Sequence, residues 1–198
     1  MSLTLLDWRR RVAQMYADVR HRAPADPPGA LADFRAVRDR LFATHPESPI
    51  PAVERPAFAG LAYWPYDPAL RFEPAVDTDV ERFRIELPMS RDEAVGAERI
   101  GRIRLPCGAL DVFWLALYGG GVFLPFRDAT SGAATYGGGR YLLDTVKGAD
   151  LGGDDGRLVV DFNYAYHPSC AYDPVWSCPL APKGNRLEVP IEAGERNR

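Results

Sequence analysis

The stretch LDVFWLALYGGGVFLPF, residues 110–126, decides the fold class of this 198-residue chain. It is almost wholly apolar on both sides of the glycines at positions 119–121. Glycine reaches positive φ without a Cβ clash, so short apolar runs on either side of such a triplet predict a β-hairpin. We therefore expect one tight antiparallel pair here, with its neighbours in the same sheet.

The segments on both sides of this hairpin have the period-two pattern of half-buried strands. Phe83, Ile85 and Leu87 alternate with charged residues, and so do Ile103 and Leu105. Further strands are predicted at FAGLAYW (58–64), RYLL (140–143), RLVVDFNYAY (157–166) and LEVPI (187–191). The expected fold is mainly β, an antiparallel barrel or sandwich, preceded by two amphipathic helices.

Both helices are predicted from apolar residues at three- and four-residue spacings. The first stripe consists of Leu5, Trp8, Val12, Met15 and Val19, and the second of Leu31, Phe34, Val37 and Leu41. Between them, HRAPADPPG (21–29) contains three prolines and is expected to be a linker. We expect an N-terminal helix and proline-rich linker over 1–29, then a single antiparallel β domain with a leading helix over 30–198.

Composition excludes several classes of protein. With 24 basic and 27 acidic residues, the net charge of −3 gives no electrostatic footprint for nucleic acid. The longest apolar run is too short for a membrane span, and no signal peptide is recognisable. Three cysteines do not make a secreted disulfide framework. We expect a soluble, cytoplasmic protein with free thiols, no nucleic-acid partner and no membrane partner, and its oligomeric state is left open.

The segment RDATSGAATYGGGRY (127–141) concentrates charged, hydroxyl and glycine residues. It lacks the Lys-Ser/Thr pair of a nucleotide P-loop, and it leads into a strand-like segment instead of a helix. The glycines are therefore expected to form a tight turn that brings Arg127 and Arg140 close together.

Two guanidinium groups need anions, and the sequence leaves two sources open. Asp128 and Asp161 can form internal ion pairs that fix the loop on the sheet. Alternatively, a ligand carboxylate or phosphate binds the arginines, held also by Thr130, Ser131 and Tyr136. In either case Arg127, Asp128, Arg140 and Asp161 are expected to meet in one polar cluster, because each needs a charge partner in apolar surroundings.

Asp161 and Asn163 are predicted on one face of the strand 157–166, opposite its apolar residues. They either form a structurally bonded pair or line a pocket. If the protein is a catalyst, Asp161 or Asp128 is the expected proton carrier, with burial and a neighbouring arginine shifting its pKa in opposite directions.

His167, Cys170 and Cys178 have the spacing H-x2-C-x7-C, which invites comparison with a zinc site. A closed zinc site takes four ligands, usually with a CxxC pair, so no metal and no cofactor are expected. A Cys–His nucleophilic pair would need a geometry that sequence proximity does not provide. The cysteines are predicted to be small buried side chains.

Five separated segments occur in an order that resembles the bacterial and archaeal domain-of-unknown-function family 1684. They are FAGLAYWPYDP, FRDATSGAATYGGGRYL, DFNYAYHPSCAY, CPLAPKGNRL and IEAGE. The resemblance covers roughly residues 34–195 and is to a short form, since longer members carry an extra segment before the FAGL-type motif. Relatives usually have Asn-Pro-Pro-Cys where this chain has His-Pro-Ser-Cys at 167–170. The resemblance implies no activity.

The sequence therefore supports a binding module, in which the glycine loop and the DFN strand form a polar pocket for a small anionic or hydroxyl-rich metabolite. One alternative is an enzyme that uses Asp161 as acid or base in the same pocket. Another is a protein-interaction scaffold that uses the helix of Trp8. Whether the protein is an enzyme is left undecided.

Overall fold

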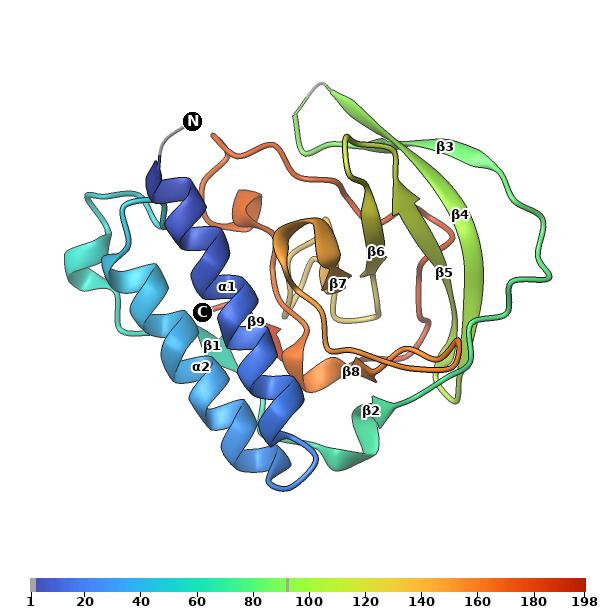
Figure 1. Cartoon of the computed structure of the whole chain (residues 1–198). Helices are drawn as coiled ribbons and strands as arrows, with labels where there is room; N and C mark the ends of the chain where they lie inside the picture. The colour runs from blue at the N-terminus through green and yellow to red at the C-terminus, as the bar shows by residue number, and fades with distance from the viewer. Residues whose placement is uncertain (1–2, 92) are drawn as a thin grey trace.

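A computed structural model describes residues 3–91 and 93–198. The chain begins with two helices, α1 (Leu3–Arg22) and α2 (Pro27–Thr44), which lie side by side on one side of the molecule (Figure 1). Asp26 caps α2 by accepting a hydrogen bond from the Gly29 amide at 3.0 Å. The predicted linker 21–29 is too long, because a proline is tolerated in the first helical turn, where its missing N–H has no partner.

The main sheet is antiparallel and has five strands in the order β3-β4-β5-β6-β7. Its strands are β3 (Arg84–Pro88), β4 (Ala94–Leu105), β5 (Gly108–Leu115), β6 (Gly121–Phe126) and β7 (Arg140–Asp144). This arrangement confirms the mainly β prediction with two leading helices. No pairing among the described strands joins β3 to β7, so the sheet is open and not a closed barrel.

Shorter elements surround this sheet. Two antiparallel pairs form, one from β1 (Ala62–Tyr63) with β9 (Glu195–Arg196) and one from β2 (Arg71–Phe72) with β8 (Val160–Asp161). The single-turn helices are η1 (Arg55–Ala57), η2 (Pro68–Leu70), η3 (Thr145–Lys147), η4 (Phe162–Tyr164) and η5 (Ser169–Ala171).

The hairpin predicted from residues 110–126 is present. Leu115 of β5 is opposite Gly121 of β6, and the turn uses φ values of 87° at Gly119 and 59° at Gly120. The first strand ends at Leu115 and not at residue 118 as expected, and Tyr118 is fully exposed. The apolar run thus continues past the strand into the turn.

The predicted ten-residue strand at 157–166 is wrong, because only Val160–Asp161 forms a strand and η4 follows at once. Arg157 and Tyr166 form isolated bridges, with Ala75 and Tyr141. Asp161 Oδ1 accepts a hydrogen bond from the Asn163 amide at 2.9 Å. Such a bond to the amide two residues ahead competes with a strand ladder and turns the chain. The predicted strand at 187–191 is also absent.

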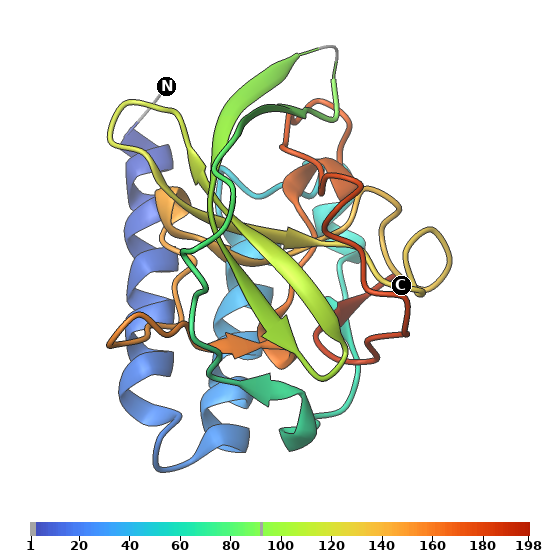
Figure 2. The ribbon, with the colours of Figure 1, turned by 90° about the vertical axis from the view of Figure 1, so that its right-hand side faces the viewer.

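The turned segment 160–166 lies between the helices and the sheet (Figures 1 and 2). The Phe162 ring contacts Phe126 of β6 at 5.1 Å between centroids, and Tyr164 contacts Phe34 of α2 at 5.0 Å. Phe34 in turn contacts Tyr16 of α1 at 5.3 Å. One hydrophobic core therefore includes residues of both helices, this segment and the sheet. Neither α1 nor any other helix of the described chain has the length and apolar character that a membrane crossing requires.

Candidate functional site

Arg140 of β7 is buried against the C-terminal segment. Its guanidinium donates to the main-chain carbonyls of Ile191 at 2.8 Å, Ala193 at 2.5 Å and Glu195 at 3.1 Å. It also lies 3.6 Å from the Asp128 carboxylate, and both side chains have no exposed surface. Burial lowers the pKa of Arg140 to about 10 while Asp128 and Glu195 oppose the shift, so the side chain stays charged at neutral pH.

Asp128 is held by the loop that it begins. It accepts hydrogen bonds from the Thr130 hydroxyl at 2.9 Å, the Ser131 hydroxyl at 3.2 Å and the Ile191 amide at 2.7 Å. Buried Asp128, Thr130 and Arg140 and half-buried Ser131 thus form one cluster, which we call the loop cluster. Its charges are matched internally, and the geometry fixes the glycine loop to the C-terminal segment.

The other two loop residues lie apart from the Asp128–Arg140 pair. Arg127 forms no salt bridge with any described residue, and its main chain bonds to Asn185 and Leu187. The Tyr136 amide donates to His167 Nε2 at 3.3 Å, and its hydroxyl lies 3.6 Å from Cys170 Sγ.

Asp161 and Asn163 form a separate group on the other side of an aromatic pair. The Arg140 guanidinium lies over Phe126 at 5.0 Å, and Phe126 contacts Phe162, the residue that follows Asp161. The structure therefore divides the eight predicted residues among several places, and the expected meeting of Asp161 with Asp128 and Arg140 does not occur. Asp161 lies instead opposite Arg71 in the β2–β8 pair.

Asn163 positions the Asp161 carboxylate. Its side-chain amide donates to Asp161 Oδ1 at 2.8 Å and to the Asp67 carbonyl at 2.8 Å, while its Oδ1 accepts from the Asp67 amide at 2.9 Å. Asp161 Oδ1 therefore receives two N–H groups from Asn163. No residue in the described part of the chain donates to Asp161 Oδ2.

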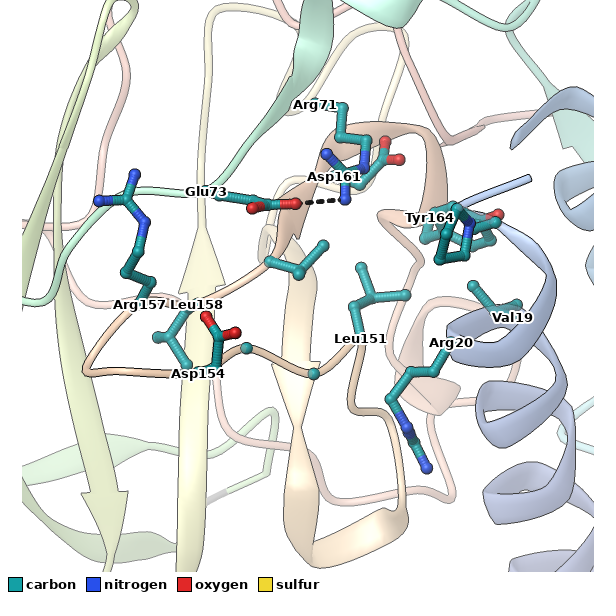
Figure 3. A pocket seen from close by; sticks show the side chains of 15 residues that line it. Val19, Arg20, Arg71, Glu73, Leu151, Asp154, Arg157, Leu158, Asp161 and Tyr164 are labelled. Carbon is teal, nitrogen blue, oxygen red and sulfur yellow. Dashed lines mark hydrogen bonds and ion pairs between the residues drawn. The ribbon is translucent and has the colours of Figure 1, made fainter. Parts of the chain in front are cut away.

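Asp161 lines a cavity of about 420 Å³ between the end of α1, β2 and the loop after β7. In Figure 3, Asp161, Arg71 and Tyr164 lie along one side of it, and Val19 and Arg20 come from α1. Asp161, Tyr164 and Val19 are buried, so they form the base. Charged side chains form the rim; they are Arg20, Arg71, Glu73, Asp154 and Arg157.

Two polar groups at the base of the cavity, the Asp161 carboxyl and the Tyr164 hydroxyl, are not fully compensated for burial by protein contacts. Burial raises the pKa of the Asp161 carboxyl, and hydrogen bonds from Asn163 and the charge of Arg71 oppose the shift only in part. The Tyr164 hydroxyl is buried without a hydrogen-bond partner among the described residues, and burial followed by the Asp161 charge raises its pKa. On the rim, Arg71 pairs with Glu73 at 2.5 Å.

The family model described as Protein of unknown function (DUF1684) matches residues 56–196. The chain belongs to this family. A similar solved structure is the solution NMR structure of an uncharacterised protein from Haloarcula marismortui. The two sequences are 37% identical, the match covers 87% of this chain and 95% of that chain, and the TM-score is 0.59. The chain has no match among curated proteins.

This DUF1684 member contains a buried ion pair that the sequence analysis missed. Arg38 of α2 donates to Glu195 Oε2 at 2.8 Å, and the same oxygen accepts from the His167 amide at 3.0 Å. Glu195 Oε1 accepts from the Tyr172 hydroxyl. Burial lowers the pKa of His167, which is therefore neutral at pH 7. The available signal was the position of Arg38, four residues after Phe34 on the apolar stripe of α2.

Cys170 and Cys178 are buried free thiols near Tyr136 and Ser90. Hydrogen bonds from Cys178, Ser90 and Tyr136 lower the pKa of Cys170 to about 6 against the effect of burial. The shared proton raises the pKa of Cys178. Over residues 3–91 and 93–198, no three His, Cys, Asp or Glu side chains are grouped as metal ligands.

Proposed function

We propose that this protein binds a small hydroxyl-rich metabolite with at most one acidic group in the cavity that Asp161 lines. The observation that carries the proposal is the Asp161 carboxylate, with Oδ1 held by Asn163 and Oδ2 left without a donor. A carboxylate oxygen at the base of a cavity accepts well from a ligand hydroxyl, because charge-assisted hydrogen bonds are roughly twice as strong as neutral ones.

The second group at the base supports the same ligand class. A buried hydroxyl without a partner costs roughly 1–3 kcal/mol. An alcohol both donates and accepts, so one ligand hydroxyl can donate to Asp161 while another group of the same ligand meets Tyr164. A ligand that carries several hydroxyl groups satisfies both at once.

The size and charge of the cavity narrow the class of ligand that it can bind. Its volume of about 420 Å³ suits a metabolite of sugar size. Three arginines on the rim are matched in number by three carboxylates, those of Glu73, Asp154 and Asp161. This balance favours a neutral sugar or a sugar acid with one carboxylate over a polyphosphate, which would need an excess of cations.

The experiment is a thermal unfolding series with sugars, sugar acids and sugar phosphates. A ligand at a hundred times its Kd stabilises the native state by about 2.7 kcal/mol, which is roughly 5–11 °C for a chain of this length. Asp161→Asn keeps an oxygen for Asn163 but loses the charge, and we expect its affinity to fall at least tenfold, roughly the value of one charge-assisted bond. Asp79→Asn, an exposed change outside the cavity, is the matched control.

A Tm that no compound in the series raises contradicts the proposal. So does a shift that is as large in Asp161→Asn as in the wild type and in Asp79→Asn.

A second candidate function is acid–base catalysis by Asp161 on the bound metabolite. It is favoured by the raised pKa of this carboxyl, because general acids and bases work best when their pKa approaches the working pH. The test is to follow each stabilising compound by NMR over hours with the wild type and Asp161→Asn. Conversion by the wild type alone supports catalysis, and an unchanged ligand spectrum leaves binding as the function.

A further inference from the structure

A second cavity lies beneath α1 and shares no residue with the cavity of Asp161. Its volume is about 200 Å³, and we call it the α1 cavity. It is enclosed by α1, the end of α2, β7 and the segments 166–169 and 176–178. Its Trp, Tyr and Phe lining consists of Trp8, Tyr16, Phe42, Tyr141, Tyr166 and Trp176.

We propose that the α1 cavity binds a single-ring aromatic acid with a hydroxyl group at the far end of the ring, of the 4-hydroxybenzoate type. Its size fits one ring, since an apolar cavity of about 150 Å³ already holds benzene. Aromatic side chains prefer edge-to-face or offset contacts with a flat ligand ring, which adds to the area that the ligand buries.

The inner end of the cavity lacks an acceptor. The Tyr16 hydroxyl is buried without a hydrogen-bond partner among the residues described, and so is Arg38 Nε. Both side chains line the α1 cavity. Burial raises the pKa of Tyr16, and the charge of Arg38 opposes the shift. Arg38 Nη2 donates to Glu195, and the guanidinium lies over the rings of Phe42 and Tyr166.

Two buried donors without an acceptor cost free energy in the empty protein. A phenolic oxygen at the inner end of a ligand can accept from both of them. This requirement distinguishes the proposed ligand from benzoate, which has a ring of the same size but no group at that position.

The outer end of the cavity carries charges of both signs. Arg9 of α1, Lys147 of η3 and Glu47 line it, and Arg9 and Lys147 are exposed. Burial raises the pKa of the Asp144 carboxyl, and the charges of Lys147 and Arg9 oppose the shift. Lys147 is 4.0 Å from Asp144, and Arg9 has no salt bridge within the described chain. Arg9 is therefore the cation at this end with which a ligand carboxylate can pair.

Two features thus fix the orientation of the ligand, with its carboxylate at Arg9 and its hydroxyl at Tyr16. Trp8 and Trp176 both line the cavity, whereas Trp64 and Trp114 do not. Binding of an aromatic ring should therefore change the fluorescence of the protein. The inference is independent of the proposed function, because it concerns other residues.

The experiment is a fluorescence and calorimetric titration of the whole chain with 4-hydroxybenzoate, benzoate and acetate. We expect saturable binding of 4-hydroxybenzoate, benzoate binding at least fivefold weaker, and none of acetate. Arg9→Gln should weaken 4-hydroxybenzoate about tenfold, as expected for loss of one charge-assisted contact. Arg10→Gln, the adjacent exposed residue outside the cavity, is the control and should bind like the wild type.

Tyr16→Phe tests the inner end without removing any hydrogen bond of the empty protein. It should abolish the preference for 4-hydroxybenzoate over benzoate while leaving benzoate affinity unchanged. The proposal is overturned if no aromatic acid binds saturably at millimolar concentration, if Arg9→Gln binds as well as Arg10→Gln, or if Tyr16→Phe retains the preference.

Discussion

Replacing Arg140 tests the interpretation of the loop cluster as a structural element. Arg140→Met keeps the length of the apolar stem and removes the guanidinium. The change leaves the carbonyls of Ile191, Ala193 and Glu195 without their donor, and Asp128 without the cation at 3.6 Å.

The expected loss in the free energy of unfolding follows from these contacts. Each buried carbonyl left without a donor costs roughly 1–3 kcal/mol, so three set a ceiling of about 9 kcal/mol. Asp128 keeps its bonds from Thr130, Ser131 and Ile191, and the protein no longer desolvates a guanidinium, so part of this cost is offset. Loss of one partner of a buried ion pair costs about 3–5 kcal/mol, which is the change that we expect.

The assay is urea unfolding followed by circular dichroism, with Tm as a second readout. A loss of about 3–5 kcal/mol corresponds to a Tm lower by roughly 6–20 °C for a chain of this length. Arg127→Met is the control, because Arg127 flanks the same loop without a salt bridge, and it should cost about 1 kcal/mol or less.

If Arg140→Met does not fold, Arg140→Lys provides the measurement. It keeps the charge but cannot reach all three carbonyls in the fixed geometry of a guanidinium, so an intermediate loss is expected. A change below about 1 kcal/mol in Arg140→Met, or one no larger than in Arg127→Met, would refute the structural interpretation.

Three other predictions follow from burial and backbone geometry. Asp161→Asn should raise the free energy of unfolding at pH 7, because burial raises the pKa of this carboxyl and its ionised form therefore destabilises the native state. The gain in stability over the wild type should vanish below the unfolded-state pKa of about 3.9. An equal gain at pH 3 and pH 7 would contradict this prediction. The Cys170 thiolate should appear in the absorbance at 240 nm with a midpoint near pH 6 and be lost in Cys170→Ser, so a wild-type midpoint above 8 would count against the hydrogen-bonded thiol. Gly139→Ala should destabilise the protein by more than 2 kcal/mol and Gly132→Ala by about 1 kcal/mol, because both have positive φ but a Cβ at 139 would lie 2.6 Å from the Phe126 carbonyl oxygen; equal losses in urea unfolding would argue against this close approach.

The parts of the fold that could be predicted are those with a local physical signal. The glycines at 119–121 specify the turn between β5 and β6, and alternation specifies β3 and β4. The strand at 157–166 was wrong because its apolar alternation did not reveal the bond from Asp161 to the Asn163 amide. A hydrogen bond between a side chain and the amide two residues ahead ends the strand there, although the apolar alternation continues.

The site was harder to predict, because it depends on contacts between distant parts of the chain. That Arg140 needs an anion follows from its sequence context, but that three main-chain carbonyls of residues 191–195 surround it does not. Asp161 was expected beside the glycine loop, and the aromatic pair of Phe126 and Phe162 separates the two. The cavity itself arises where α1 meets β2, which no motif encodes.

The most direct test of ligand binding in the Asp161 cavity is a 1H–15N NMR titration of the labelled protein with the sugar or sugar acid that stabilises it most. We predict saturable shifts of the amides of Gly152 and Gly153, which line the cavity, and of Asn163, which donates to Asp161, and we predict that Asp161→Asn loses these shifts. Shifts confined to other parts of the chain, or no saturable shift with any compound in the series, would contradict this prediction.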